Sequence, residues 1–256
     1  MNKKIERTRD EVLGYDIVKS NVLIRDARSN LSLVGQKVIL FVLSKIKYDD
    51  PKLNEIEFGI GEFCDLLGID KKSAGTYYHI KNTIQNIADA SLWINLPEED
   101  DLRTEILFRW FETVKIKPGT DKVIVRLSSE LEPYLVELRE QFTKYPLRNV
   151  LAMKSQYGII LYEYLKSYEF IGEHTIEIEE LKKKMNAEKY KKNANFMQKV
   201  FYVAVQNINE FTELKIKYNF IKEGRKYVGV HFFIEKRTDL YELDKIYQNQ
   251  RESLNF

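Results

Sequence analysis

The residues of this chain best placed to do chemistry are amides and a lysine on one side of a predicted helix, Asn193–Glu210. Apolar residues recur along this segment at helical spacing, so one side is expected to be buried and the other to face solvent. No Asp or Glu occurs between Asn193 and Asn209. Amides can hydrogen-bond to adenine edges and lysine to guanine edges in the major groove of DNA. The pattern predicts a base-reading helix on which the reading residues are Asn195, Gln198, Lys199 and Tyr202, with Gln206 and Asn209 on the same side.

Cations flank this helix and are expected to contact DNA phosphates, which position a protein on the duplex without reading its sequence. Gly224 permits a tight turn between two predicted strands, so the cations beside it would lie at the tip of a hairpin. Lys182 and Lys184 share a predicted short helix with Lys183 and are further candidates. The predicted backbone contacts are Lys183, Lys191, Lys192, Lys222, Arg225 and Lys226.

The charge of the chain is distributed unevenly. Residues 139–237 contain 19 Lys+Arg and 12 Asp+Glu, a balance of +7, whereas residues 1–138 contain 20 and 23, a balance of −3. Residues 238–256 contain 2 and 4, a balance of −2, so the three parts sum to the chain's formal +2. A segment with this excess of cations is suited to face a polyanion.

A second helix, predicted at Ser73–Ala90 with Ser73 as N-cap, carries a weaker set of polar groups. The nearby acidic loop 98–101 would be repelled by phosphate and should point away from DNA. We therefore expect only auxiliary DNA contacts from this helix, made by Thr76, His79, Lys81 and Asn82.

Catalysis is not expected from this sequence. No Gly-rich segment ends in Gly-Lys-Ser or Gly-Lys-Thr, so no P-loop is predicted. His79, His174 and His231 lack the paired spacing of a metal-dependent nuclease or DNA-nicking enzyme. Cys64 is the single cysteine and is expected to be a small buried apolar residue. The prediction is a binding protein with no catalytic residue, no metal and no other cofactor.

The chain has no apolar run of the length that a membrane span needs, and Met1–Asp10 is charged where a signal peptide would be apolar. A soluble, cytoplasmic protein without a membrane partner is the expectation.

The order of predicted elements occurs twice along the chain, which indicates an internal repeat at domain spacing. Each copy reads helix, strand, short helix, long helix and strands, as expected for a winged helix, in which the long helix can enter the major groove and the hairpin lies along the backbone. The first copy is predicted as helix Leu31–Lys47, strand Glu55–Phe58, helices Gly61–Gly68 and Ser73–Ala90, and strands Ser91–Leu96, Glu105–Lys115 and Lys122–Leu127. The second is predicted as helix Lys154–Phe170, strand Thr175–Ile178, helices Glu179–Met185 and Asn193–Glu210, and strands Leu214–Phe220 and Tyr227–Ile234.

The fold class is therefore α+β, with two tandem winged-helix domains. We expect a flexible segment at 1–14, a first domain at 15–138 for dimerisation and auxiliary DNA contact, a second domain at 139–237 as the main DNA reader, and a tail at 238–256. A helix at Glu130–Leu138 is expected to connect the two domains.

Three segments of the chain resemble, in order, the theta-type plasmid replication initiators, the Rep proteins that bind iteron repeats. The first is IVKSNVLIRDARSNLSLVGQKVILFVLSKI at Ile17–Ile46, and the second is MKSQYGIILYEYLKSY at Met153–Tyr168. The third is NFMQKVFYVAVQNINEFTELKIKY with the later GRKYVGVHFFIEK, which resemble the recognition helix and wing of the second winged helix. The resemblance spans approximately Tyr15–Arg237. The family often has an arginine where this chain has Ile160.

The resemblance implies a replication initiator that binds iterons in origin DNA through its second domain. It also implies that dimers repress the protein's own gene, whereas monomers open the origin and recruit a host replication initiator and helicase. A transcriptional regulator on the same fold is the alternative, since a fold does not fix a function. The two unequal winged helices favour initiation, because a simple repressor typically needs one.

The first domain has more apolar residues than one buried face requires, in Leu31–Lys47 and in Ile106–Val114, which includes Phe108, Trp110 and Phe111. Surplus apolar surface is commonly buried by a partner, although a core shared with the second domain would absorb it equally well. We therefore expect a homodimer formed through this region, with Trp110 as its test position.

Overall fold

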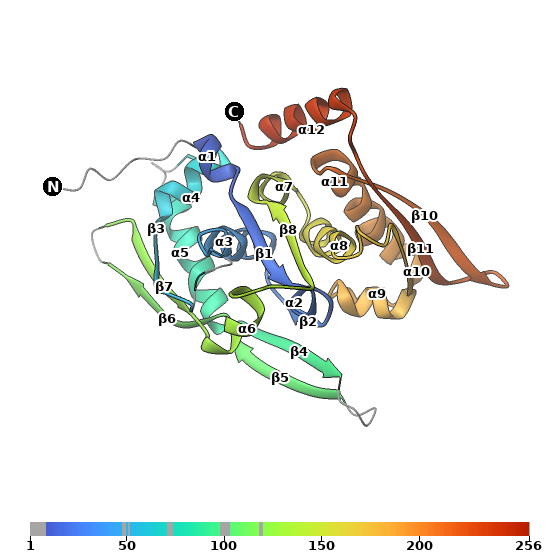
Figure 1. Cartoon of the computed structure of the whole chain (residues 1–256), viewed down its shortest axis with the longest axis horizontal. Helices are drawn as coiled ribbons and strands as arrows, with labels where there is room; N and C mark the ends of the chain where they lie inside the picture. The colour runs from blue at the N-terminus through green and yellow to red at the C-terminus, as the bar shows by residue number, and fades with distance from the viewer. Residues whose placement is uncertain are drawn as a thin grey trace.

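A computed structural model of the chain describes residues 9–47, 50, 52–70, 74–97, 103–117 and 120–255. It confirms the predicted α+β architecture of two winged helices (Figure 1). The expected N-cap Ser73, the acidic loop 98–101 and most of the segment 1–14 lie outside the described residues.

The first winged helix begins at α3, whose N-cap Ser32 accepts a hydrogen bond from the Gly35 amide at 3.1 Å. The helix α4 ends at Gly68, where φ is +65°, a left-handed conformation that glycine adopts at little cost. In the sheet, β7 lies between β3 and β6. The elements of this unit are α3 (Leu33–Leu43), β3 (Ile56–Gly59), α4 (Ile60–Leu67), α5 (Ala74–Asp89), β6 (Phe111–Ile116) and β7 (Lys122–Leu127).

The second winged helix has the same topology, since its middle strand β11 lies between β9 and β10. The predicted reading helix is continuous but changes its winding, from α10 through a π-helical turn into α11. The elements are α8 (Gln156–Lys166), β9 (Glu173–Glu177), α9 (Ile178–Lys184), α10 (Asn193–Phe196), the π-turn Met197–Phe201, α11 (Tyr202–Phe211), β10 (Leu214–Glu223) and β11 (Lys226–Lys236).

Two predicted elements of the first unit are wrong. The single strand expected at Glu105–Lys115 is two strands in different sheets, β5 (Arg103–Arg109) and β6, with the break at Trp110. The strand β5 pairs with β4 (Ser91–Pro97) in a hairpin that is inserted before the wing, and β4 also pairs with β2 (Ala27–Ser29). The connector helix expected at Glu130–Leu138 is only a 3₁₀ turn, Ser129–Leu131, and a single turn, α6 (Glu132–Leu135). Extended Val136 and left-handed Glu137, with φ of +53°, end it.

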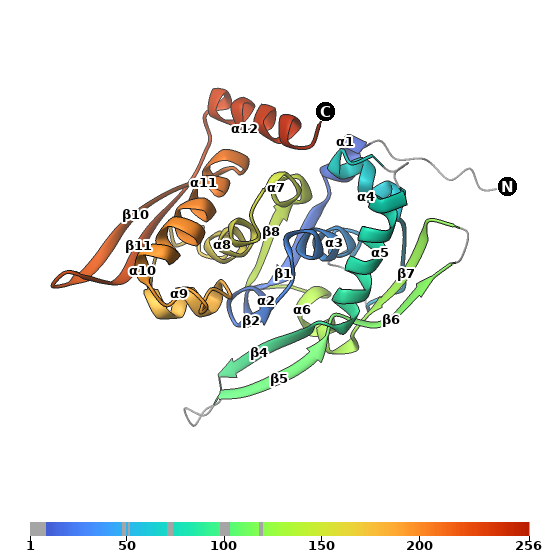
Figure 2. The same cartoon turned by 180° about the vertical axis from the view of Figure 1, so that it is seen from behind.

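The junction of the two units contains elements that sequence periodicity did not indicate. An antiparallel pair, β1 (Asp16–Ser20) and β8 (Phe142–Pro146), runs between α3 and α8 (Figures 1 and 2). The other elements are α1 (Arg9–Leu13), α2 (Asn21–Arg25), α7 (Leu147–Ala152) and α12 (Leu240–Ser253). The helix α12 crosses from the second unit towards α4, and Asn255, just beyond it, donates to the Gly68 carbonyl at 3.2 Å.

Most of the apolar surplus of the first unit is absorbed inside the chain, so α3 and Trp110 do not offer the exposed dimer surface that was expected from them. The helix α3 packs against α5, α7 and α8 and buries every residue from Val38 to Leu43. Trp110 is 6% exposed, and its indole Nε1 donates to Ser29 Oγ at 3.0 Å. One apolar core continues through both units, which is the alternative to a dimer interface. No helix in the described part of the chain is long and apolar enough to cross a membrane.

Candidate nucleic-acid interface

The π-turn explains how the reading helix keeps a straight polar side. Buried residues come in adjacent pairs, and successive pairs are four positions apart. An α-helix has 3.6 residues per turn, so in a regular α-helix each pair would be rotated slightly around the axis relative to the pair before it. A π-helical turn contains more residues than an α-helical turn, so it offsets this rotation and keeps the buried pairs against the core. The buried pairs are Phe196 with Met197, Val200 with Phe201, and Ala204 with Val205. All four predicted reading residues, Asn195, Gln198, Lys199 and Tyr202, are exposed, as is Gln206.

Hydrogen bonds anchor both ends of the reading helix. At its start, Asn193 Oδ1 accepts from Lys182 Nζ at 2.7 Å, and Asn193 Nδ2 donates to the Tyr227 carbonyl at 3.3 Å. At its end, Arg237 donates to the carbonyls of Thr212 at 2.7 Å and Asn209 at 3.1 Å. The helix is therefore tied to α9, to the wing and to the strand that leaves the wing.

Three polar residues expected at the interface are used inside the protein instead. Asn209 exchanges two hydrogen bonds with the main chain of Ile216, at 2.7 and 3.0 Å, so its amide is occupied. Lys182 is buried beside Glu179 and Asn193. Lys184 donates to main-chain carbonyls of the first unit. These three assignments are corrected, because a side chain with satisfied internal partners is not free to meet DNA.

The cations predicted to contact phosphates lie on the surface of the second unit. The wing between β10 and β11 ends at Gly224, where φ is +59° and an added Cβ would meet nothing within 4 Å, so the tip projects into solvent. Lys222 Nζ lies 5.1 Å from the centre of the Tyr227 ring, so the two strands are also in contact through side chains next to the turn. The exposed cations are Lys183, Lys191, Lys192, Lys222, Arg225 and Lys226.

Aromatic rings join the reading helix to the wing, a feature that sequence reasoning missed. Phe201 contacts the rings of Tyr218 and Phe220 on β10, with centroids 4.8 and 5.3 Å apart. Tyr202, exposed on the helix, lies 6.5 Å from Tyr218, which is partly exposed beside it. Burial raises the pKa of Tyr218 further above neutral pH. Its hydroxyl, like that of an ordinary tyrosine, is protonated and can donate a hydrogen bond. The alternation of apolar and polar residues along Leu214–Phe220 was the sequence signal that could have placed Tyr218 on this side of the strand.

The auxiliary residues of the first unit all lie on α5. His79 and Asn82 are exposed, whereas Thr76 and Lys81 are partly buried. Tyr78 is 61% exposed on the same helix and was not among the predicted contacts. This side of α5 is less accessible than the polar side of the reading helix.

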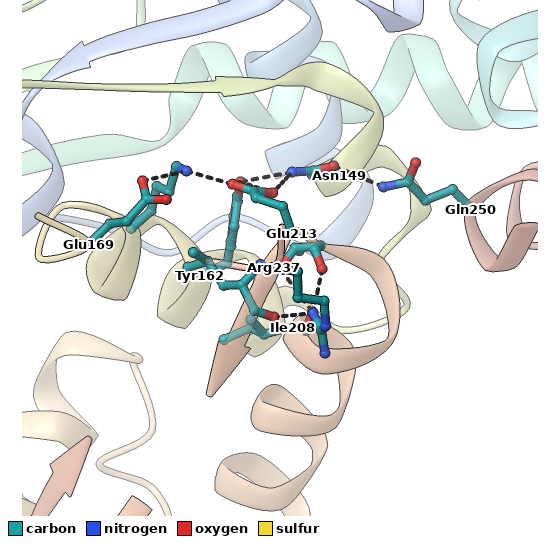
Figure 3. Close-up of polar contacts among 10 residues, drawn as sticks. Asn149, Tyr162, Glu169, Ile208, Glu213, Arg237 and Gln250 are labelled. Atoms are coloured by element: carbon teal, nitrogen blue, oxygen red, sulfur yellow. Dashed lines mark hydrogen bonds and ion pairs between the residues drawn. The ribbon is translucent and has the colours of Figure 1, made fainter. Parts of the chain in front are cut away.

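A buried polar network lies behind the reading helix, where α11 turns into β10 (Figure 3). Lys166 Nζ forms ion pairs with Glu213 and Glu169, each at 2.6 Å. Tyr162 donates to Glu213 at 3.1 Å and accepts from Asn149 at 2.9 Å. From α12, Gln250 donates to Asn149 Oδ1 at 2.8 Å. The network joins α7, α8, α12 and the turn between α11 and β10. Its residues were not predicted, because apart from the pair Lys166 and Glu169, which are three residues apart, the partners are more than ten residues apart in sequence.

His174 and His231 lie on neighbouring strands, closer together than the sequence indicated, whereas His79 lies on α5. His174 on β9 stacks on Tyr168 with centroids 3.8 Å apart, and its Nε2 lies 2.8 Å from Tyr164 Oη. His231 Nδ1, on the neighbouring strand β11, lies 2.7 Å from Thr175 Oγ1. Burial, with Arg25 and His231 nearby, lowers the pKa of His174 to about 4. Among the described residues, no group of three or more His, Cys, Asp and Glu side chains could hold a metal ion.

Ile160, where the family often has an arginine, faces the interior. Its side chain is partly buried against the core and lines a cavity between α2, α3, α8 and α9. The position therefore faces the other unit, and Lys184 lines the same cavity.

Family models match both units of the chain. Residues 16–166, a range that also includes α7 and α8, match the model of the initiator replication protein first winged helix, WH1. Residues 177–234 match that of the initiator Rep protein second winged helix, WH2. The fold is similar to a crystal structure of the Pi initiator protein in complex with iteron DNA, with a TM-score of 0.71 at 20% identity over 88% of this chain and 99% of that one. Domains 2 and 3 of RctB match with a TM-score of 0.49 at 16% identity, over 83% of this chain and 86% of that one.

Proposed function

The chain belongs to the initiator replication (Rep) protein family, and we propose that it starts plasmid replication by binding iteron repeats in origin DNA through its second winged helix. The observation that carries this proposal is the reading helix, whose exposed side bears Gln198 and Lys199 without any acid from Asn193 to Asn209. The likeness in fold to the Pi protein, which was crystallised with iteron DNA, supports the same mode of binding.

The binding mode follows from the positions of the side chains. Asn195, Gln198, Lys199 and Tyr202 would face base edges in the major groove, where amides and lysine discriminate between base pairs. The cations at the wing tip and before the helix would contact phosphates on either side. We propose that the second unit binds DNA without a metal or cofactor and without catalysing a reaction on it.

We propose that residues 15–138 provide dimerisation and auxiliary DNA contact, whereas residues 139–237 are the main reader. The β4–β5 hairpin is the surface that we favour for a homodimer. Trp93 and Leu107 are direct cross-strand neighbours on it and are 39% and 52% exposed. Since β5 is the outer strand of its sheet, main-chain groups on its outer edge could pair with a second copy. By family resemblance, such a dimer would repress its own gene, and the initiating form would recruit a host initiator and helicase in the cytoplasm.

A replication assay tests the proposed function. The gene and its neighbouring DNA are placed on a vector without an origin, and transformants are counted with and without the tandem repeats beside the gene. We expect colonies only when both the gene and the repeats are present. A Gln198→Ala/Lys199→Ala variant should lose this activity while remaining folded. Replication that persists without the repeats would contradict iteron-dependent initiation.

A further inference from the structure

Lys184 ends α9 in the second unit, yet its amine is bound by the first unit. Its Nζ donates to the main-chain carbonyls of Ile24, of Arg25 at 2.9 Å and of Ala27 at 3.1 Å. These oxygens lie where α2 ends and β2 begins. Burial lowers the pKa of the Lys184 amine to about 7. When the amine is protonated it has three donors, and each finds an acceptor among these carbonyls. The end of a helix offers unpaired carbonyls and favours a nearby cation.

The segment that receives Lys184 is firmly part of the first unit. The strand β2 pairs with β4, with Ala27 opposite Ile94 and Ser29 opposite Leu92. Leu23 and Ile24 of α2 are buried in the core. A shift of Lys184 relative to this segment would therefore be a shift of the second unit relative to the first.

Neighbouring contacts reinforce the same junction. Asn186, with φ of +50°, donates from Nδ2 to the Ser29 carbonyl at 2.9 Å. Arg25 Nε donates to Ser167 Oγ at 3.0 Å, and its guanidinium lies 3.9 Å from the centre of the Tyr168 ring. The two figures agree that α2 and β2 lie beside α9 (Figures 1 and 2).

The same short helix also holds the reading helix. Lys182, two residues before Lys184, bonds to Asn193 Oδ1 at 2.7 Å, and Asn193 is the first residue of α10. The helix α9 thus contacts the first unit through Lys184 and the start of the reading helix through Lys182. Its position determines where the reading helix lies relative to α5.

We propose that Lys184 is a positioning residue that fixes the first winged helix relative to the reading helix, so that both units meet DNA at one spacing. This inference rests on the proposed function, in which both units contact the duplex. Two rigidly joined readers tolerate only one separation of their sites along the helical DNA.

Hydrogen exchange on the full chain without DNA tests the contact itself. In a Lys184→Met variant, amides within residues 21–29 should exchange about tenfold faster or more, because local opening becomes easier once the three carbonyls lose their donor. Lys166→Met is the control, since Lys166 is a buried lysine of the second unit whose ion pairs, with Glu169 and Glu213, stay within that unit. Should Lys184→Met fail to fold, Asn186→Gly keeps the left-handed backbone and removes only the Ser29 bond, so it should show a smaller increase.

DNA spacing tests the positioning role. The probes are a duplex with one origin repeat and the same duplex with two base pairs inserted at its centre. The wild-type chain should lose about tenfold or more in affinity on insertion, whereas Lys184→Met should bind the normal repeat more weakly and lose about threefold or less. Unchanged exchange at 21–29, or an insertion penalty equal to the wild type, would overturn the proposal. If the wild-type chain does not prefer the repeat to shuffled DNA, the proposed function fails, and the exchange result alone decides whether Lys184 joins the units.

Discussion

At the scale of residues, base reading and phosphate contact should separate by mutation. Gln198→Ala and Lys199→Ala should each remove roughly 1–3 kcal/mol of discrimination between the target repeat and a mismatched duplex. Arg225→Ala and Lys226→Ala should weaken binding to all duplexes about equally, because phosphates are the same in every sequence. Competition titrations with matched and mismatched duplexes measure both effects. Uniform losses from all four variants would mean that the helix lies on the backbone and not in the groove.

His174 should make the stability of the protein sensitive to acid. Its pKa is lowered from 6.5 to about 4, so between these values the unfolded chain binds more protons than the folded one. The free energy of unfolding should therefore fall as pH drops from 6.5 towards 4. A His174→Gln variant should lose part of this dependence. Urea unfolding of both proteins at pH 7 and pH 5 measures it, and an identical pH dependence in the two would refute the assignment.

The exposed reading residues were predictable, because helical periodicity alone separates Gln198 and Lys199 from the buried Val200 and Phe201. The internal hydrogen bonds of Asn209 and Lys184 were not predictable. Asn209 bonds to Ile216 across a turn, and Lys184 meets carbonyls about 160 residues away in the chain. A polar residue on a helix carries no signal of which distant main-chain atoms will lie opposite, so sequence alone left both on the surface.

At the scale of elements, the C-terminal helix α12 should stabilise the junction of the units. It buries Ile246 and Gln250, and just beyond its end Leu254 is 2% exposed. Each buried aliphatic side chain contributes about 1.5–3 kcal/mol. For a chain of this size, each kcal/mol of lost stability lowers Tm by about 2–4 °C. Loss of residues 239–256 should therefore lower Tm by roughly 10 °C. Thermal unfolding measures this shift.

Two point variants in α12 provide the matched comparison. Ile246→Ala should lower Tm, whereas Leu240→Ala, at a residue 78% exposed on the same helix, should not. Equal effects from the two variants, or no effect of the truncation, would show that the helix does not hold the units.

The β4–β5 hairpin should carry self-association. Leu107→Glu places a charge beside Trp93 on the exposed apolar pair and should convert dimers into monomers. Thr104→Glu adds the same charge on the other side of β5 and serves as the control. Sedimentation of the full chain over a concentration range measures the outcome. A wild-type chain that stays monomeric at tens of micromolar, on the usual scale of weak association, would contradict the proposal.

Long periodic elements such as α5, α8 and the reading helix were predictable to within a few residues. The hairpin was not, because the apolar run across Trp110 hides a change of sheet in which Phe108 pairs with Leu92 and Phe111 with Leu127. The strands β1 and β8 were missed for another reason. Each has five residues, and Asp16 pairs with Pro146, so neither segment shows its partner locally.

At the scale of the whole molecule, the distribution of charge supports the roles that we propose for the two units. The second unit carries the cationic excess, whereas the first contributes the hairpin and most of the acids. Shared core contacts and Lys184 join the two, so binding by the second unit is expected to place the first on the same duplex.

Origin recognition is tested by a competition titration of the full chain on a duplex with one direct repeat from beside its gene, against the same duplex with its sequence shuffled. We expect the repeat to bind about a thousandfold more tightly or more, as specific DNA-binding proteins do. With six proposed phosphate contacts, the logarithm of affinity should fall against the logarithm of salt concentration with a slope of about −5. Equal affinity for repeat and shuffled DNA would contradict the claim that this chain reads an origin sequence.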